Sequence, residues 1–199
     1  MKLITALFAS LVFSSTAVAQ PLAPFLGASM TARHGSSLAP ITHEKQIAYA
    51  DPTIVRVGST FYLTGTASER PQGFSVLKSK DLKTWTPVGR LLTEGKQVYG
   101  NKGFWAPQFY KNGKTWQLAY TANEQVAVAE APKLTGPYTQ KQVKPVDESA
   151  KNIDPFVFTD DDGKSYLFHV RFNNGNFIWV AAYDKNTQTI DRNTLQRCL

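Results

Sequence analysis

Residues 50–66 read ADPTIVRVGSTFYLTGT, and this stretch predicts the fold because its plan recurs twice further along the chain. An Asp-Pro pair opens a β-branched run, Gly58 marks a turn, and an aromatic run follows. The same order returns around Gly113 and Gly163, at successive spacings of 55 and 50 residues. A repeat of about this length, with several strands in each copy, is typical of solenoids and propellers.

Each copy is expected to supply four short strands, because Asn-Gly and Asp-Gly hairpin signals separate short β-prone runs. The expected strands are 53–57, 60–66, 73–78 and 84–88, then 108–110, 115–121, 125–130 and 138–140, then 156–158, 165–171, 176–182 and 189–190. Four strands per unit, repeated radially, make a propeller blade. The predicted fold class is therefore all-β, a β-propeller with blades of about 50–100, 101–150 and 151–199. A β-sandwich is the alternative, but it gives no reason for the Pro, Gly and aromatic residues to recur together.

The N-terminal residues 1–19 predict an export signal. Lys2 precedes an apolar stretch, and Ala17-Val18-Ala19 forms a small-residue cleavage site. Residues 20–49 are rich in Pro, Ala and Ser and are expected to form an extended lead-in to the propeller at 50–199. We therefore expect a secreted or periplasmic protein that is not embedded in a membrane.

The chain is basic, with 22 Lys and Arg against 15 Asp and Glu, a formal net charge of +7. Nucleic-acid binding needs basic residues clustered on one face with interleaved aromatic residues. Here the lysines stand singly or in pairs beside predicted turns, which is the pattern of a solvated surface. We predict no nucleic-acid partner, and the oligomeric state stays open.

Two aspartates directly precede blade-opening prolines, at Asp51-Pro52 and Asp154-Pro155. Proline is tolerated at the first residue of a strand and holds the residue before it extended. The innermost strands of a propeller start beside the central axis, so both side chains are expected in one axial cavity although 103 residues separate them. Either aspartate alone is better explained as a turn residue. Both at equivalent positions of a repeat favour catalysis.

The combination of motifs resembles glycoside hydrolase family 43. The segments that carry the resemblance are residues 50–66, 79–85 (SKDLKTW), 104–107 (FWAP), 152–155 (NIDP) and 161–164 (DDGK). The resemblance implies a five-bladed propeller that hydrolyses arabinose- or xylose-containing plant cell-wall saccharides with inversion. It also implies that Asp51 is the general base and that Asp154 tunes the pKa of the general acid and orients it.

That family's general acid is a glutamate in a Glu-Gly-Pro setting after the third blade, and no glutamate of this chain matches that position. We therefore expect a chain truncated to about three blades and inactive as 199 residues. A non-catalytic carbohydrate-binding propeller, or an inactive fragment, is the alternative. Arabinose versus xylose specificity and exo versus endo action stay open.

Three further residues are candidates for substrate binding: Trp105, Phe104 and Arg171. The two aromatic rings are suited to stacking on a sugar, with packing between blades as the alternative for both. Arg171 is placed to reach a sugar hydroxyl, with a surface role as its alternative. No cofactor and no metal site are predicted, because the histidines do not cluster, although an axial cation in a full-length protein stays an alternative.

Overall fold

The computed structural model describes residues 47–198. The predicted export signal, residues 20–46 of the predicted lead-in, and Leu199 lie outside the described residues. Residues 47–198 contain no α-helix, and their one helical turn is the 3-10 turn η1 (Arg192–Thr194). The strands are β1 (Ala50–Val57), β2 (Thr60–Thr66), β3 (Gly73–Ser79), β4 (Thr86–Thr93), β5 (Trp105–Asn112), β6 (Thr115–Ala122), β7 (Gln125–Ala131), β8 (Asn152–Thr159), β9 (Ser165–Phe172), β10 (Asn176–Asp184), β11 (Thr189–Ile190) and β12 (Gln196–Arg197). The all-β fold class is confirmed.

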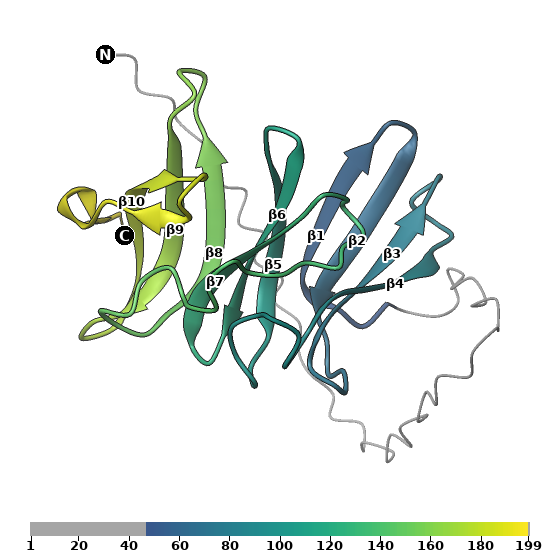
Figure 1. Ribbon diagram of the computed structural model, residues 1–199, viewed down its shortest axis with the longest axis horizontal. Helices are drawn as coiled ribbons and strands as arrows, with labels where there is room; N and C mark the ends of the chain where they lie inside the picture. The colour runs from purple at the N-terminus through teal and green to yellow at the C-terminus, as the bar shows by residue number, and fades with distance from the viewer. Residues whose placement is uncertain (1–46, 199) are drawn as a thin grey trace, which may run out of the picture. The chain divides into compact units, whose positions relative to one another are not determined.

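The first sheet is antiparallel in the order β1-β2-β3-β4, as expected for a four-stranded blade (Figure 1). Gly58, with a φ of 59°, forms the turn between its first two strands, a conformation that glycine adopts at little cost. The prediction that the fourth strand spans 84–88 is wrong at both ends. The carboxylate of Asp81 accepts the backbone N–H groups of Lys83 and Thr84 at 2.8 Å each, so those residues are held in a turn.

The second sheet has three strands in the order β5-β6-β7, so the prediction of a fourth strand at 138–140 is wrong. This segment makes only an isolated bridge between Thr139 and Glu130. The backbone N–H groups of Tyr138 and Gln140 point the other way and bond to carbonyl oxygens of the first blade and of the segment after it. The pairing with β7 is therefore limited to one bridge, and the segment is not a fourth strand of this sheet.

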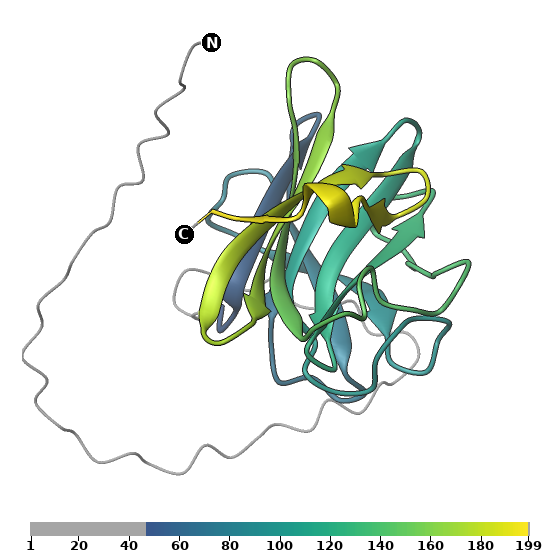
Figure 2. The ribbon, with the colours of Figure 1, turned by 90° about the vertical axis from the view of Figure 1, so that its left-hand side faces the viewer.

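The third sheet has the order β11-β10-β9-β8, and β12 also pairs with β10. The short edge strand at 189–190 is confirmed, whereas β12 was not predicted. Side chains alternate along β9: Leu167, His169 and Arg171 are buried, and the residues between them are half-buried. Figure 2 shows this sheet in front of the second one.

The three sheets pack on one another in chain order, and two apolar clusters lie between them. One joins the first two sheets through residues such as Phe74, Leu91, Phe109, Leu118 and Tyr138. The other joins the second and third sheets through residues such as Ala119, Val126, Val128, Val157 and Leu167. Innermost strands are neighbours, with β1 beside β5 and β5 beside β8. Three sheets in radial sequence are blades of a propeller, not the two layers of a sandwich.

A side-chain amide also joins the second blade to the third. Gln108 on β5 donates to the carbonyl oxygen of Val157 on β8 at 3.1 Å, and its amide oxygen accepts the N–H of Val157 at 2.6 Å. The amide therefore pairs with β8 as a neighbouring strand would. This contact lies three residues beyond Asp154.

Candidate active site

Each blade opens with the same irregularity at the residue before its proline. The innermost strand carries a bulge in every blade, between the register positions Ala50 and Thr53, Trp105 and Gln108, and Ile153 and Phe156. At these bulges Asp51, Ala106 and Asp154 have φ angles of 47°, 46° and 57°. Bulges re-aim side chains and are common beside active sites. The repeat therefore presents the side chains of residues 51, 106 and 154 in equivalent ways.

Asp51 is solvent exposed, and one of its carboxylate oxygens is held by a neighbouring strand. The hydroxyl of Thr66, at the end of β2, donates to Asp51 Oδ2 at 2.8 Å. The same hydroxyl oxygen accepts the backbone N–H of Ala106 in the next blade, also at 2.8 Å. Among the described residues no donor bonds to Asp51 Oδ1, so that oxygen is left for solvent. Asp51 is thus held through Oδ2, while its Oδ1 is left for solvent.

Asp154 lies at the same place in the third blade, and its side chain is also exposed. Its backbone N–H donates to the hydroxyl of Thr121 at the end of β6, at 3.0 Å. The pKa of Asp154 is raised above the ordinary value, first by partial desolvation of the carboxyl and second by the negative charge of Asp51. The charge of Asp51 therefore contributes to the raised pKa of the Asp154 carboxyl.

The two predicted aromatic residues of the FWAP segment face different environments. Phe104 is 4% exposed and stacks on Tyr120 with ring centroids 5.8 Å apart, so it is a core residue. Its predicted contact with sugar is corrected to packing between the blades. Trp105 is 38% exposed at the bulge of the second blade. Its ring packs against Gly103, where an added Cβ would stand only 3.0 Å from the ring. Trp105 remains available to a ligand.

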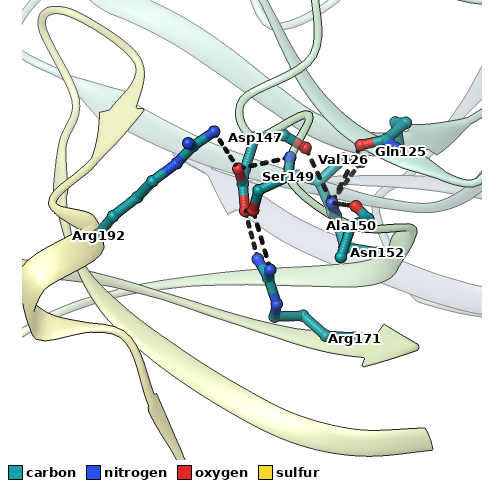
Figure 3. Close-up of polar contacts among 8 residues, drawn as sticks. All are labelled: Gln125, Val126, Asp147, Ser149, Ala150, Asn152, Arg171 and Arg192. Atoms are coloured by element: carbon teal, nitrogen blue, oxygen red, sulfur yellow. Dashed lines mark hydrogen bonds and ion pairs between the residues drawn. The ribbon is translucent and has the colours of Figure 1, made fainter. Parts of the chain in front are cut away.

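Arg171 is buried, which corrects both the predicted sugar contact and the alternative surface role. Its guanidinium forms an ion pair with Asp147, whose side chain is 3% exposed, and donates to the hydroxyl of Ser149 at 2.9 Å (Figure 3). Arg192 donates to the other oxygen of Asp147 at 2.6 Å. Asp147 and Arg192 were not singled out from the sequence, because they lie outside the predicted strands and no local motif marks them.

Asn152 ties the start of β8, two residues before Asp154, to the second blade. Its side-chain oxygen accepts the N–H of Val126 at 2.8 Å. Its side-chain nitrogen donates to the carbonyl oxygens of Asp147 and Ala150 at 3.0 and 2.7 Å and lies 3.0 Å from the amide oxygen of Gln125 (Figure 3). The amide is 1% exposed and its hydrogen-bonding groups are used. It fixes the strand that carries Asp154.

Four of the described glutamates bond to partners other than the two aspartates. Glu69, Glu124 and Glu130 form ion pairs with Arg90, Lys151 and Lys141, and Glu94 accepts the backbone N–H of Gln72. In the described part of the chain no three His, Cys, Asp or Glu residues are grouped closely enough to hold a metal ion. Burial lowers the pKa of His169 to about 4, so its imidazole is neutral near pH 7. No helix among residues 47–198 is long and apolar enough to cross a membrane.

Comparisons with known proteins identify a family that the chain resembles in sequence and in fold. The family model "Glycosyl hydrolases family 43" matches residues 43–198. An extracellular endo-alpha-(1->5)-L-arabinanase of Bacillus subtilis is 29% identical over 92% of this chain and 55% of that protein. A xylan 1,3-beta-xylosidase of a Vibrio species is 30% identical over 68% of this chain and 26% of its own length. The crystal structure of an endo-1,4-beta-xylanase from Bacteroides thetaiotaomicron superposes with a TM-score of 0.72 and 38% identity, over 76% of this chain and 52% of that one. The chain thus spans about half the length of these relatives or less.

Proposed function

The chain belongs to glycosyl hydrolases family 43, and on that premise we propose that the protein hydrolyses O-glycosidic bonds of arabinose- or xylose-containing plant cell-wall saccharides with inversion. Asp51 is the general base and Asp154 the modulator of the general acid. The observation that supports the proposal is the pair of equivalent bulges at which the first and third blades carry these two carboxylates. The general acid is assigned to no residue of this sequence.

The surroundings of Asp51 support its role as the base. An inverting enzyme needs a carboxylate that takes a proton from water as that water attacks the anomeric carbon. Thr66 holds Asp51 Oδ2, so the side chain cannot rotate freely. The second oxygen faces solvent and is the atom that accepts the proton of the attacking water.

The electrostatics of Asp154 support a different role. A carboxylate near a general acid raises the pKa of that acid by like-charge repulsion and keeps it protonated near neutral pH. The negative charge of Asp51 contributes to the raised pKa of Asp154, so an interaction between carboxylates is already present in this part of the proposed site. Its backbone is fixed by Thr121, which suits a group that orients another residue.

The substrate class rests on the relatives and on Trp105. The relatives named above act on arabinan and xylan according to their names, and both polymers offer furanose or pyranose rings with an apolar face. Trp105 is exposed at the bulge between the two aspartate-bearing blades. We propose that its ring stacks on a sugar beside the scissile bond. Export is proposed as well, on the signal predicted at residues 1–19 and on the extracellular arabinanase relative.

The proposal is tested by assaying the protein in two lengths, residues 20–199 and the whole open reading frame that encodes them. Aryl α-L-arabinofuranoside and aryl β-D-xyloside are the first substrates, followed by arabinan and xylan. We expect turnover by the product of the whole reading frame and none by residues 20–199. Proton NMR of the first-formed sugar should show the inverted anomer. Asp51→Asn should lower kcat by about 10²–10⁴-fold, the usual contribution of a general base.

Two results would count against the enzyme. Near-wild-type turnover by Asp51→Asn would remove that residue from the mechanism. No turnover of any substrate by the whole product, together with saturable binding of arabino- or xylo-oligosaccharides, would instead favour a non-catalytic carbohydrate-binding propeller.

A further inference from the structure

Two threonine hydroxyls connect the pre-proline bulges of successive blades. Thr66, the last residue of β2, donates to Asp51 Oδ2 and accepts the N–H of Ala106. Thr121, near the end of β6, accepts the N–H of Asp154. A hydroxyl has one hydrogen to donate and two lone pairs with which to accept. Thr66 can therefore serve the carboxylate of its own blade and the backbone of the next at once.

The two threonines occupy equivalent positions. Thr66 is the register partner of Ala50, and Thr121 is the register partner of Trp105, in each case directly before the bulge. At the corresponding position of the third blade, opposite Ile153, stands Val170, which has no hydroxyl. The hydroxyls thus occur at the two junctions that link the aspartate-bearing blades through the second blade.

We propose that Thr66 and Thr121 are positioning residues that set the separation and orientation of Asp51 and Asp154, with the second blade as the spacer between them. The inference rests on the proposed function and names the groups that hold its two carboxylates in place. The connection runs from Asp51 through Thr66 to the bulge at Ala106, then across the β5–β6 pair to Thr121 and the N–H of Asp154.

The physical need for such a device comes from charge and from backbone conformation. Two carboxylates near one another repel, so a free Asp51 side chain would rotate away from Asp154. A non-glycine residue at positive φ is strained, and Ala106 has no polar side chain with which to offset this. The hydrogen bond from Ala106 N–H to Thr66 stabilises the bulge at the place where Ala106 lacks that help.

The test compares Thr66→Val, Thr121→Val and Thr66→Ser in the product of the whole reading frame. Thr64→Val is the matched control, because Thr64 lies two residues earlier on the same strand and its hydroxyl donates to the backbone carbonyl of Ser75 at 2.7 Å and not to Asp51. We expect Thr66→Val and Thr121→Val each to lower kcat by about 10–100-fold with KM little changed, because a small misplacement of a catalytic group has an effect of this size. Thr66→Ser should retain most of kcat, and Thr64→Val should retain it fully.

A second readout does not depend on turnover. Carbon-13 NMR titration of the Asp154 carboxyl should give a lower pKa in Thr66→Val than in the wild type, because the released Asp51 charge moves away. If the wild type hydrolyses nothing, the proposed function fails, and this titration still decides the positioning role. Thr66→Ala replaces Thr66→Val if the latter does not fold. Unchanged kcat and an unchanged pKa of Asp154, or equal losses in Thr64→Val, would overturn the proposal.

Discussion

Asp147→Asn should destabilise the fold strongly, because it removes the counter-charge of a buried arginine. The side chains of Asp147 and Arg171 are 3% and 8% exposed. Asparagine has nearly the shape of aspartate but no charge, so the substitution leaves the guanidinium of Arg171 buried without a counter-charge. Breaking a buried pair in this way costs about 3–5 kcal/mol of unfolding free energy. For a domain of this size that corresponds to a fall in Tm of roughly 6–20 °C.

The second arginine of the cluster supplies the control. Arg192 also bonds to Asp147, but its side chain is 59% exposed. An exposed ion pair contributes about 0–1 kcal/mol, so Arg192→Ala should change stability by no more than that. Arg171→Met should be costly, since it leaves Asp147 with only the exposed partner. The double variant Asp147→Asn with Arg171→Met should lose less than the two single losses added together.

The pH dependence gives an independent check. Burial acts to raise the pKa of Asp147, but hydrogen bonds from Ser149 and the charge of Arg171 outweigh it and lower the pKa. A carboxyl with a depressed pKa in the folded state stabilises the protein above its ordinary pKa. It loses that contribution as pH falls through the depressed value. The difference in stability between the wild type and Asp147→Asn should therefore narrow in strong acid.

Urea unfolding followed by circular dichroism and tryptophan fluorescence measures these free energies. The reasoning is refuted if Asp147→Asn loses no more than Arg192→Ala. It also fails if the double variant loses the full sum of the single losses, because that result would mean the two buried charges do not interact.

Three further predictions concern the blades and the proposed site. Asp51→Asn should lower the pKa of Asp154, because it removes one of the two causes that raise it; an unchanged carboxyl titration by NMR would mean that the two groups do not interact. Phe104→Ala should cost about 3–5 kcal/mol as a core truncation, whereas Trp105→Ala should leave urea stability nearly unchanged and weaken oligosaccharide binding by calorimetry. Gln108→Ala should cost about 1–3 kcal/mol in urea, because it leaves buried backbone groups of β8 without partners; no loss would show that the amide does not bridge the blades.

The sequence predicted those parts of the fold that local signals determine. The turns at Gly58, Gly113 and Gly163 and the hairpins around them follow from residues within a few positions of each glycine, and all three are present. The fourth strands were predicted less well. Their ends depend on contacts with distant segments, such as the bond from Tyr138 to Leu91 of another blade.

The sequence predicted that the candidate site residues recur with the repeat. It did not predict which of their side chains are exposed and which are buried. Phe104 directly precedes β5 and is buried, whereas Trp105 begins β5 and is exposed, and nothing local in the sequence distinguished the two rings. The burial of Arg171 depends on Asp147, 24 residues earlier in an irregular segment. The supporting threonines did have a signal, since Thr66 and Thr121 each follow a pre-proline residue by 15 positions. That spacing gains meaning only once the register is known.

The three bulges also show that the backbone conformation at these positions does not depend on the chemistry of the side chain. Strained residues gather at functional sites, and a positive φ at Asp51 or Asp154 would by itself invite that inference. Ala106 has the same conformation without any reactive group, so the conformation belongs to the repeat, in which a proline and a bulge recur. The case for catalysis therefore rests on what the repeat carries at each position. Of the three described blades, the first and third carry carboxylates at this position, and the charge of Asp51 contributes to the raised pKa of Asp154.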